Sequence, residues 1–213
     1  MTFLSRKDAG IRLGESLRAQ GVVAELVLGM PRGGVVVAGE VARILRLPLD
    51  IIVVRKIGHP WNREFAVGAL AEGGVVVIDE QSLGPDKALR RELDLIVSEE
   101  KKRLHDYRRL FRRARPVERA GKAVLLVDDG LATGATAEAA VKALLAQQVR
   151  HVTVAVPVAS TSAVARLRNA GADVVTLVTD PEFVAVGQYY LDFTQTGDEE
   201  VLSILRASEA EGR

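Results

Sequence analysis

Residues 124–136 read VLLVDDGLATGAT, and this stretch decides how the chain folds. Four apolar residues are followed directly by two acids, Asp128 and Asp129, and then by a turn of small residues. A short apolar run that ends in such a turn is typical of a buried strand leading into a helix. We therefore expect this acid pair at the carboxyl end of a strand, which is where open α/β sheets bind ligands.

The turn after the acid pair has the composition of an anion-binding loop. Backbone N–H groups of residues 132–136, here called the phosphate loop, would open a helix, where unpaired donors and the positive end of the helix dipole meet. Gly134 permits close approach of the backbone, and Thr133 and Thr136 add hydroxyl donors. Two acids would repel a nearby phosphate, whereas ribose hydroxyls and hydrated Mg²⁺ both favour carboxylate oxygens. The pattern therefore predicts a ligand that brings phosphate, ribose and Mg²⁺ together.

Apolar strands alternate with helical segments on both sides of this stretch. We expect strands at residues 24–28, 49–54, 73–78, 123–127, 152–156 and 174–178. Helices are expected at residues 5–20, 35–45, 86–113, 135–148 and 162–170, with an irregular tail at 179–196. This order predicts an α/β fold with a mostly parallel twisted sheet flanked by helices. Residues 1–213 would form a single domain, with 58–118 inserted in it as a flexible loop (or hairpin) plus a long charged helix.

Composition excludes several classes of function. A formal net charge of +1 argues against general binding of nucleic acid or membrane surfaces. The chain has no cysteine, which excludes disulfides, thiolate catalysis and Cys-ligated zinc, and its three histidines are too scattered for a metal cluster. No apolar run is long enough to span a bilayer, and the first residues lack the features of a signal peptide. We therefore expect a cytoplasmic protein without nucleic-acid or membrane partners.

The stretch 124–136 resembles the signature of type I phosphoribosyltransferases: an apolar strand, two acids, two variable residues, then a small residue followed by Thr-Gly. No Lys follows Gly134, so the stretch is not a Walker A loop. The resemblance implies that the ligand is 5-phosphoribosyl-1-pyrophosphate, with Mg²⁺ as cofactor held by Asp128 and Asp129 largely through water. It also implies a small hood built from the N- and C-terminal segments, namely helix 5–20 and residues 183–193, and a homo-oligomer, by resemblance a dimer.

Two further segments resemble the pyrophosphate-binding parts of that family. GMPRGG at residues 29–34 places Arg32 before Gly33 and Gly34, and family members often have a cis peptide bond before this basic residue. A Pro-Gly turn with a solvent-exposed Arg32 is the alternative. VVRKIG at residues 53–58 places Arg55 and Lys56 at the end of the next strand, before a flexible loop at 58–73 that would cover the site. Candidates in that loop are His59, Arg63 and Glu64, which are equally plausible as surface residues.

The tail segment FVAVGQYYLDF at residues 183–193 resembles the part of the hood where a base stacks on an aromatic ring. Phe183 or Tyr189 would provide that ring, although packing of the tail onto the core explains these aromatics too. Family enzymes for 6-oxopurines carry an acid where this chain has Ala132, which disfavours hypoxanthine and guanine. The acceptor base remains open, and residues 79–118 have no counterpart in the resemblance.

These patterns predict a Mg²⁺-dependent phosphoribosyltransferase that acts on a nucleobase-like acceptor. The expected catalytic residues are Asp128, Asp129, Arg32 and Lys56. The expected substrate-binding residues are Gly33, Gly34, Arg55, Gly130, Ala132, Thr133, Gly134, Ala135, Thr136, Phe183 and Tyr189. The alternative is a sensor that binds the same donor without catalysis. Basic residues in both pyrophosphate segments favour the enzyme, and the lack of a DNA-reading module disfavours a transcriptional regulator.

Overall fold

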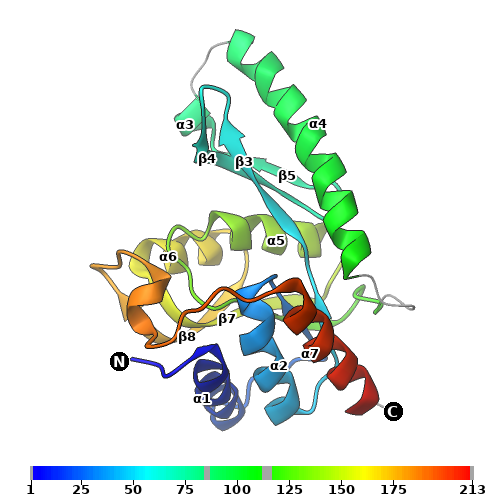
Figure 1. Cartoon of the computed structure of the whole chain (residues 1–213), viewed down its shortest axis with the longest axis vertical. Helices are drawn as coiled ribbons and strands as arrows, with labels where there is room; N and C mark the ends of the chain where they lie inside the picture. The colour runs from blue at the N-terminus through cyan, green and yellow to red at the C-terminus, as the bar shows by residue number, and fades with distance from the viewer. Residues whose placement is uncertain (1, 84–86, 112–116, 212–213) are drawn as a thin grey trace.

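The computed structural model describes residues 2–83, 87–111 and 117–211, and Figure 1 shows the arrangement of their helices and strands. Five parallel strands form the core sheet in the order β2-β1-β6-β7-β8. These strands are β1 (Leu26–Gly29), β2 (Leu49–Ile51), β6 (Ala123–Val127), β7 (His151–Ser160) and β8 (Asp173–Asp180). The expected α/β fold with a mostly parallel sheet is confirmed.

Helices cover both faces of the core sheet (Figure 1). α1 (Arg6–Ala19), α2 (Gly33–Leu45) and α7 (Asp198–Glu211) lie on one face, and α5 (Ala135–Ala146) and α6 (Thr161–Asn169) lie on the other. Successive residues of a strand point to opposite faces of the sheet, so each apolar strand contributes side chains to two hydrophobic cores. On β6, Leu125 and Val127 pack with α1, α2 and α7, whereas Val124 and Leu126 pack with α5 and α6.

A second, antiparallel sheet lies beyond α5. This small sheet has the order β3-β4-β5 and consists of β3 (Val54–His59), β4 (Asn62–Ala71) and β5 (Val76–Ile78). The expected strand at 49–54 is therefore wrong as one strand, because β2 ends at Ile51 and β3 begins at Val54 in the other sheet. Residues 58–73 form most of the β3–β4 hairpin, which was the alternative to an irregular loop.

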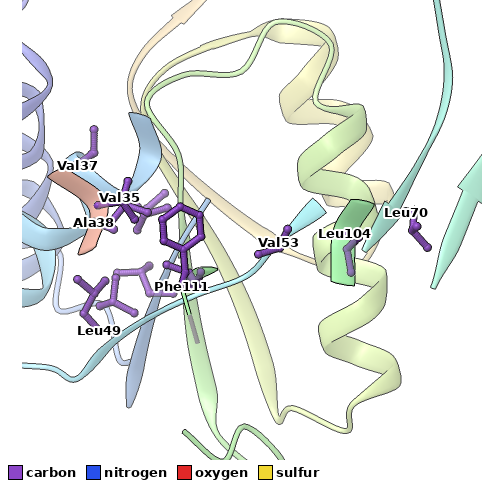
Figure 2. Packing of buried hydrophobic residues seen from close by; sticks show 14 of the residues in the cluster. Val35, Val37, Ala38, Leu49, Val53, Leu70, Leu104 and Phe111 are labelled. Atoms are coloured by element: carbon purple, nitrogen blue, oxygen red, sulfur yellow. The ribbon is translucent and has the colours of Figure 1, made fainter. Parts of the chain in front are cut away.

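The small sheet is held between two helices because β4 is apolar on both faces. Ala69 and Ala71 pack with the alanine-rich helix α5. Val67 and Leu70 belong to the core cluster that includes α4 (Lys87–Leu110), which follows the short helix α3 (Glu80–Leu83). Figure 2 shows Leu104 of α4 near Leu70, and Phe111 near Val35 and Leu49. The end of α4 thus reaches back to the core sheet beside the loop before α2.

The N- and C-terminal segments come together as the expected hood. Phe3 forms a parallel bridge with Tyr190, with hydrogen bonds from Phe3 N to Tyr189 O at 2.7 Å and from Leu191 N to Phe3 O at 2.9 Å. We call residues 2–5 and 183–194 the hood; it includes the 3-10 helix η1 (Val186–Tyr189), whereas most of the expected helix 5–20 is α1, which packs on α2. Ser5 caps α1, since its hydroxyl accepts from Asp8 N. α7 was not expected from the sequence, yet it packs on α2 through buried Val201 and Leu205.

Within the described part of the chain, no helix combines the length and the apolarity needed to cross a membrane.

Candidate functional site

The acid pair lies directly after β6, at the carboxyl end of the core sheet, as expected. Asp129 N donates a hydrogen bond to Asp128 Oδ1 at 2.9 Å. The side chain of Asp129 is held by Arg6 of α1, whose Nε lies 2.6 Å from Asp129 Oδ2. Tyr190 of the hood donates its hydroxyl to Asp129 O at 2.5 Å. The acid pair is therefore enclosed by elements from both ends of the chain.

Gly33 and Gly34 begin α2 and pack directly on the acid pair. A Cβ atom at Gly33 would lie 2.1 Å from Asp129 Oδ2, and one at Gly34 would lie 2.6 Å from Asp128 Oδ1. At Gly34 a Cβ atom would also lie 2.8 Å from Asp128 Cα, so that position requires glycine for space, whereas a side chain at Gly33 would displace Asp129 and Arg6. The Pro31–Arg32 peptide bond is cis, as the family resemblance implied. The loop at 29–34 and the acid pair thus form one site.

Burial controls the electrostatics of the acid pair. Loss of hydration raises the pKa of Asp128 well above its usual range, and the negative charge of Asp129 raises it further. Burial also raises the pKa of Asp129, while the hydrogen bond and charge of Arg6 oppose this shift. Mg²⁺ favours oxygen ligands, and the acid pair offers carboxylate oxygens of that kind. Asp128 and Asp129 therefore fit Mg²⁺ if water and ligand oxygens complete its coordination.

The phosphate loop opens α5 as expected. Gly134 is the N-cap residue, with a φ of 72° in the left-handed region that favours glycine. A glycine cap has no side chain to accept from the first N–H groups of α5, and Ala135 N donates instead to Thr133 Oγ1 at 3.4 Å. Ser160, at the end of β7, donates its hydroxyl to Ala132 O at 2.5 Å and fixes the loop from behind. Thr133 and Thr136 are exposed beside it.

An open pocket of about 650 Å³ adjoins the phosphate loop. It is lined by Ala132, Thr133, Ser160, Thr161, Ser162, Ala165, Pro181, Phe183 and Val184. The ring of Phe183 stacks on Tyr189 with centroids 5.3 Å apart, and Tyr189 is only 9% exposed. A hydrogen bond from the Tyr189 hydroxyl to Asp180 raises the pKa of Tyr189 to about 12. Phe183 therefore reaches the pocket, whereas Tyr189 supports it from beneath.

The expected pyrophosphate residues are not gathered in one place. Arg55 and Lys56 lie within β3 of the small sheet, not at the end of a core strand. Their neighbours on β4 are Leu70 and Ala69, which pack toward α4 and α5 respectively, so the two basic side chains lie on opposite faces. Arg55 Nε donates to Glu100 Oε2 of α4 at 2.9 Å. The structure thus places the Arg32 side chain beside Asp198 and separates the two basic residues of β3 from each other.

The side chain of Arg32 lies beside an acid that the sequence did not indicate. Its Nη1 lies 3.7 Å from Oδ1 of Asp198, the first residue of α7. Burial raises the pKa of the Tyr107 hydroxyl of α4, and the negative charge of Asp198 adds to this shift. Arg6, Tyr107, Asp198 and Glu100 are therefore missed neighbours of the site. A local pattern could not reveal them, because each looks like an ordinary surface position of an amphipathic helix.

A family model described as the phosphoribosyl transferase domain matches residues 18–194. The chain therefore belongs to the phosphoribosyl transferase domain family, which confirms the resemblance drawn from residues 124–136.

Individual relatives agree with this assignment. The chain is 42% identical over 207 residues to Rv0571c of Mycobacterium tuberculosis H37Rv, a protein named provisionally as a phosphoribosyl transferase. That match covers 95% of this chain and 46% of the relative, so the chain spans about half the relative's length. The chain is 49% identical in sequence to TT1426 from Thermus thermophilus. The crystal structure of that protein matches with a TM-score of 0.77, and the match covers 96% of this chain and 98% of TT1426.

A more distant structure shows the fold alone. A hypothetical protein from Neisseria gonorrhoeae with bound ppGpp is 18% identical, with a TM-score of 0.54 and coverage of 97% of this chain and 96% of that one.

Proposed function

We propose that this chain transfers a 5-phosphoribosyl group from 5-phosphoribosyl-1-pyrophosphate, the donor, to a nucleobase-like acceptor and releases pyrophosphate. The observation that carries the proposal is the packing of Gly33 and Gly34 against Asp129 and Asp128. This contact joins the loop at 29–34 to the acid pair, and the phosphate loop follows three residues later in the chain. A donor with phosphate at one end and pyrophosphate at the other fits such a site.

In the proposed reaction the bond from the anomeric carbon to pyrophosphate breaks, a bond from that carbon to an acceptor nitrogen forms, and the proton of that nitrogen is released to solvent. Residues 132–136 would hold the 5-phosphate as a remote anchor, so that binding energy positions the reacting carbon. Asp128 and Asp129 would accept hydrogen bonds from ribose hydroxyls and stabilise positive charge on the sugar. Arg32 would offset the charge that grows on the leaving pyrophosphate. Mg²⁺, when bound, supplies further positive charge to the pyrophosphate oxygens.

The pocket beside the phosphate loop supports a nucleobase-like acceptor. Its lining combines hydroxyl groups with the ring of Phe183 and small apolar side chains. Stacking of a base on an aromatic ring contributes about 1–3 kcal/mol. Ala132 lies in the lining where the 6-oxopurine enzymes of the family carry an acid, so we favour an acceptor other than hypoxanthine or guanine.

A donor-binding sensor is the second candidate, and one observation favours it. Arg32 lies beside Asp198, and Arg55 is hydrogen bonded to Glu100, so both arginines already face acids of the same chain. A sensor requires only that the donor binds, whereas a transferase must also stabilise the departing pyrophosphate. A cytoplasmic homodimer is proposed for either candidate, and sedimentation analysis tests the dimer.

The deciding experiment measures pyrophosphate release with the donor, Mg²⁺ and a panel of bases and amines. We expect Arg32→Ala to lower turnover roughly a hundredfold or more with the true acceptor, since it removes a contact that strengthens in the transition state. Donor affinity, measured by titration calorimetry, should fall by a smaller factor. Arg43→Ala is the matched control, because Arg43 lies in the last turn of α2, the helix that Arg32 precedes, and pairs with Glu40 away from the site.

A protein that binds the donor tightly but releases no pyrophosphate above background with any acceptor in the panel would be a sensor. That result would end the transferase proposal and leave the binding site in place.

A further inference from the structure

We infer that Arg6 is a positioning residue of the acid pair, which orients Asp129 toward the ribose and couples it to the C-terminal part of the hood. This inference rests on the proposed function, because it assigns the ribose of the donor to Asp129. Arg6 lies outside residues 18–194, the part of the chain that the family model matches.

Arg6 makes three contacts in three directions. Its Nε lies 2.6 Å from Asp129 Oδ2, and its Nη1 donates to Thr194 O at 2.7 Å. Its guanidinium carbon lies 3.9 Å from the centre of the Phe193 ring. The planar fork of a guanidinium can serve two acceptors while it stacks on a ring, which an ammonium group cannot do. These contacts therefore fix Arg6 between the acid pair and residues 193–194.

The contact with Asp129 is enclosed and tightly bounded. The side chains of Arg6 and Asp129 are 12% and 16% exposed. A Cβ atom at Gly33 would lie 2.5 Å from Arg6 Nε, so the backbone of α2 closes the third side. Two adjacent carboxylates that are largely removed from water repel each other, and a guanidinium at this distance offsets that repulsion. Arg6 thus provides the positive charge that lets the acid pair exist beside an anionic donor.

The geometry divides the oxygens of Asp129 between two tasks. Arg6 occupies Oδ2, which leaves Oδ1 to accept from the ribose hydroxyls. Tyr190 holds the main chain of the same residue through its hydrogen bond to Asp129 O at 2.5 Å. Arg6 and Tyr190 therefore connect Asp129 to the tail segment that also carries Phe183 of the pocket. A sugar that engages Asp129 and a base that stacks on Phe183 would share this connection.

The test compares two ligands that differ only by the sugar. Inorganic phosphate and ribose 5-phosphate are titrated calorimetrically against wild type, Arg6→Gln and Arg6→Lys, without Mg²⁺. The control is Arg12→Gln, because Arg12 lies on the same helix and pairs with Asp8 at 3.0 Å away from the acid pair. We expect Arg6→Gln to weaken ribose 5-phosphate roughly tenfold or more, as loss of a charge-assisted hydrogen bond does, and to leave inorganic phosphate nearly unchanged. Arg6→Lys should retain part of the affinity, and Arg12→Gln all of it.

Equal affinity of Arg6→Gln and wild type for ribose 5-phosphate would overturn the inference and leave Arg6 as a structural link only. Tighter binding by Arg6→Gln would also overturn it, because Arg6 would then block the sugar. Wild-type protein that binds neither ligand would refute the proposed function itself, and this outcome is distinct from the other two. If Arg6→Gln does not fold, Phe193→Leu replaces it: removal of the ring under Arg6 should weaken ribose 5-phosphate about twofold to fivefold, and no change would overturn the inference.

Discussion

The two ends of the proposed donor site are built in different ways. The phosphate loop is a single continuous turn between β6 and α5, and its backbone supplies the donors. The proposed pyrophosphate side instead involves Arg32 of the loop before α2, whose side chain lies beside Asp198 of α7. One end is thus fixed by local geometry, and the other by docking of distant elements. We expect substitutions far from the site to leave ligand binding at the first end unchanged and to alter ligand binding at the second.

The largest expected effect on ligand binding comes from a variant that disrupts the local end. Gly134→Val places a β-branched residue at a φ of 72°, where its Cβ would also lie 3.1 Å from Ala163 Cβ. We expect donor affinity to fall by roughly a hundredfold or more, because the turn that presents the N–H groups cannot keep its shape. Titration calorimetry with the donor and with inorganic phosphate measures this.

Gly21→Val is the matched control for that variant, since Gly21 has a φ of 66° and an added Cβ would meet nothing within 4 Å. Its backbone strain is similar but lies outside the site. Equal loss of donor affinity in both variants would contradict the assignment of residues 132–136 to phosphate binding.

The second prediction concerns the distant end, where a buried cluster of charged side chains joins separate elements. Arg119 precedes β6 and contacts Glu72 of the turn after β4, Ile51 O at 2.7 Å and Asp50 Oδ2 at 3.5 Å. It therefore ties the small sheet to the edge of the core sheet. Arg119→Ala leaves Glu72 buried without its main partner, and we expect a loss of about 3–5 kcal/mol in the free energy of unfolding.

Urea unfolding measures that loss, with Arg150→Ala as control. Arg150 pairs with Glu25 at 2.7 Å but is 59% exposed, so its removal should lower stability by less than about 1 kcal/mol. Binding of inorganic phosphate by folded Arg119→Ala should equal that of wild type. If phosphate binding fell together with stability, the two ends of the site would not be independent.

A smaller effect separates two roles of Asp198. Its carboxylate lies 3.7 Å from Arg32, where pyrophosphate would bind. Asp198→Asn removes the carboxylate charge that would compete with pyrophosphate for Arg32. We expect pyrophosphate to bind roughly twofold to fivefold more tightly, because a half-exposed ion pair contributes little free energy. Glu199→Gln and Glu200→Gln make the same change of charge in the same turn of α7 and serve as controls. Weaker binding in Asp198→Asn would instead show that Asp198 holds Arg32 in place.

The smallest expected effect concerns the hydrogen bond between Tyr189 and Asp180, beside the local end, and it depends on pH. The hydrogen bond from Tyr189 lowers the pKa of Asp180, with a further contribution from Glu182 N. A carboxyl group whose pKa is lowered by folding stabilises the protein at pH values above its unfolded pKa, which is near 3.8. This stabilisation is lost as the pH falls through the folded pKa. Tyr189→Phe should therefore be slightly less stable than wild type at neutral pH, and the difference should vanish in stronger acid. Thermal unfolding from pH 7 to pH 2 tests this, with Phe183→Leu as a variant whose effect should not depend on pH.

The local end could be predicted from the sequence because thirteen consecutive residues contain all of it. The strand, the acid pair and the glycine turn are neighbours in the chain, so their order alone determines their geometry. Gly33 and Gly34 were also recognisable, since a second strand-to-helix turn of a parallel sheet must open on the same edge. Phe183 was found together with Tyr189, but only the structure shows which of the two reaches the pocket.

The distant end could not be predicted, because its contacts join residues that are far apart in sequence. Arg6 and Asp129 are separated by 123 residues, and nothing near either residue indicates the other. Arg55 and Lys56 were grouped because they are adjacent, yet adjacent residues of a strand face opposite ways once β3 is known to pair with β4. Recognition of the β3–β4 hairpin would have separated them. Both ends of the expected helix 86–113 lie outside the described residues.

The contact between Arg6 and Thr194 also sets an order of events during synthesis. The two residues are 188 positions apart, so Arg6 leaves the ribosome long before its partner exists. At about 5–20 residues per second, the interval is roughly 10–40 s. Asp129 emerges within that interval, and its carboxylate can meet Arg6 before the tail that braces Arg6 has been made. The part of the proposed site around the acid pair is therefore completed last, and a ribosome stalled before residue 194 would carry a chain whose phosphate loop can form while its acid pair is still open to water.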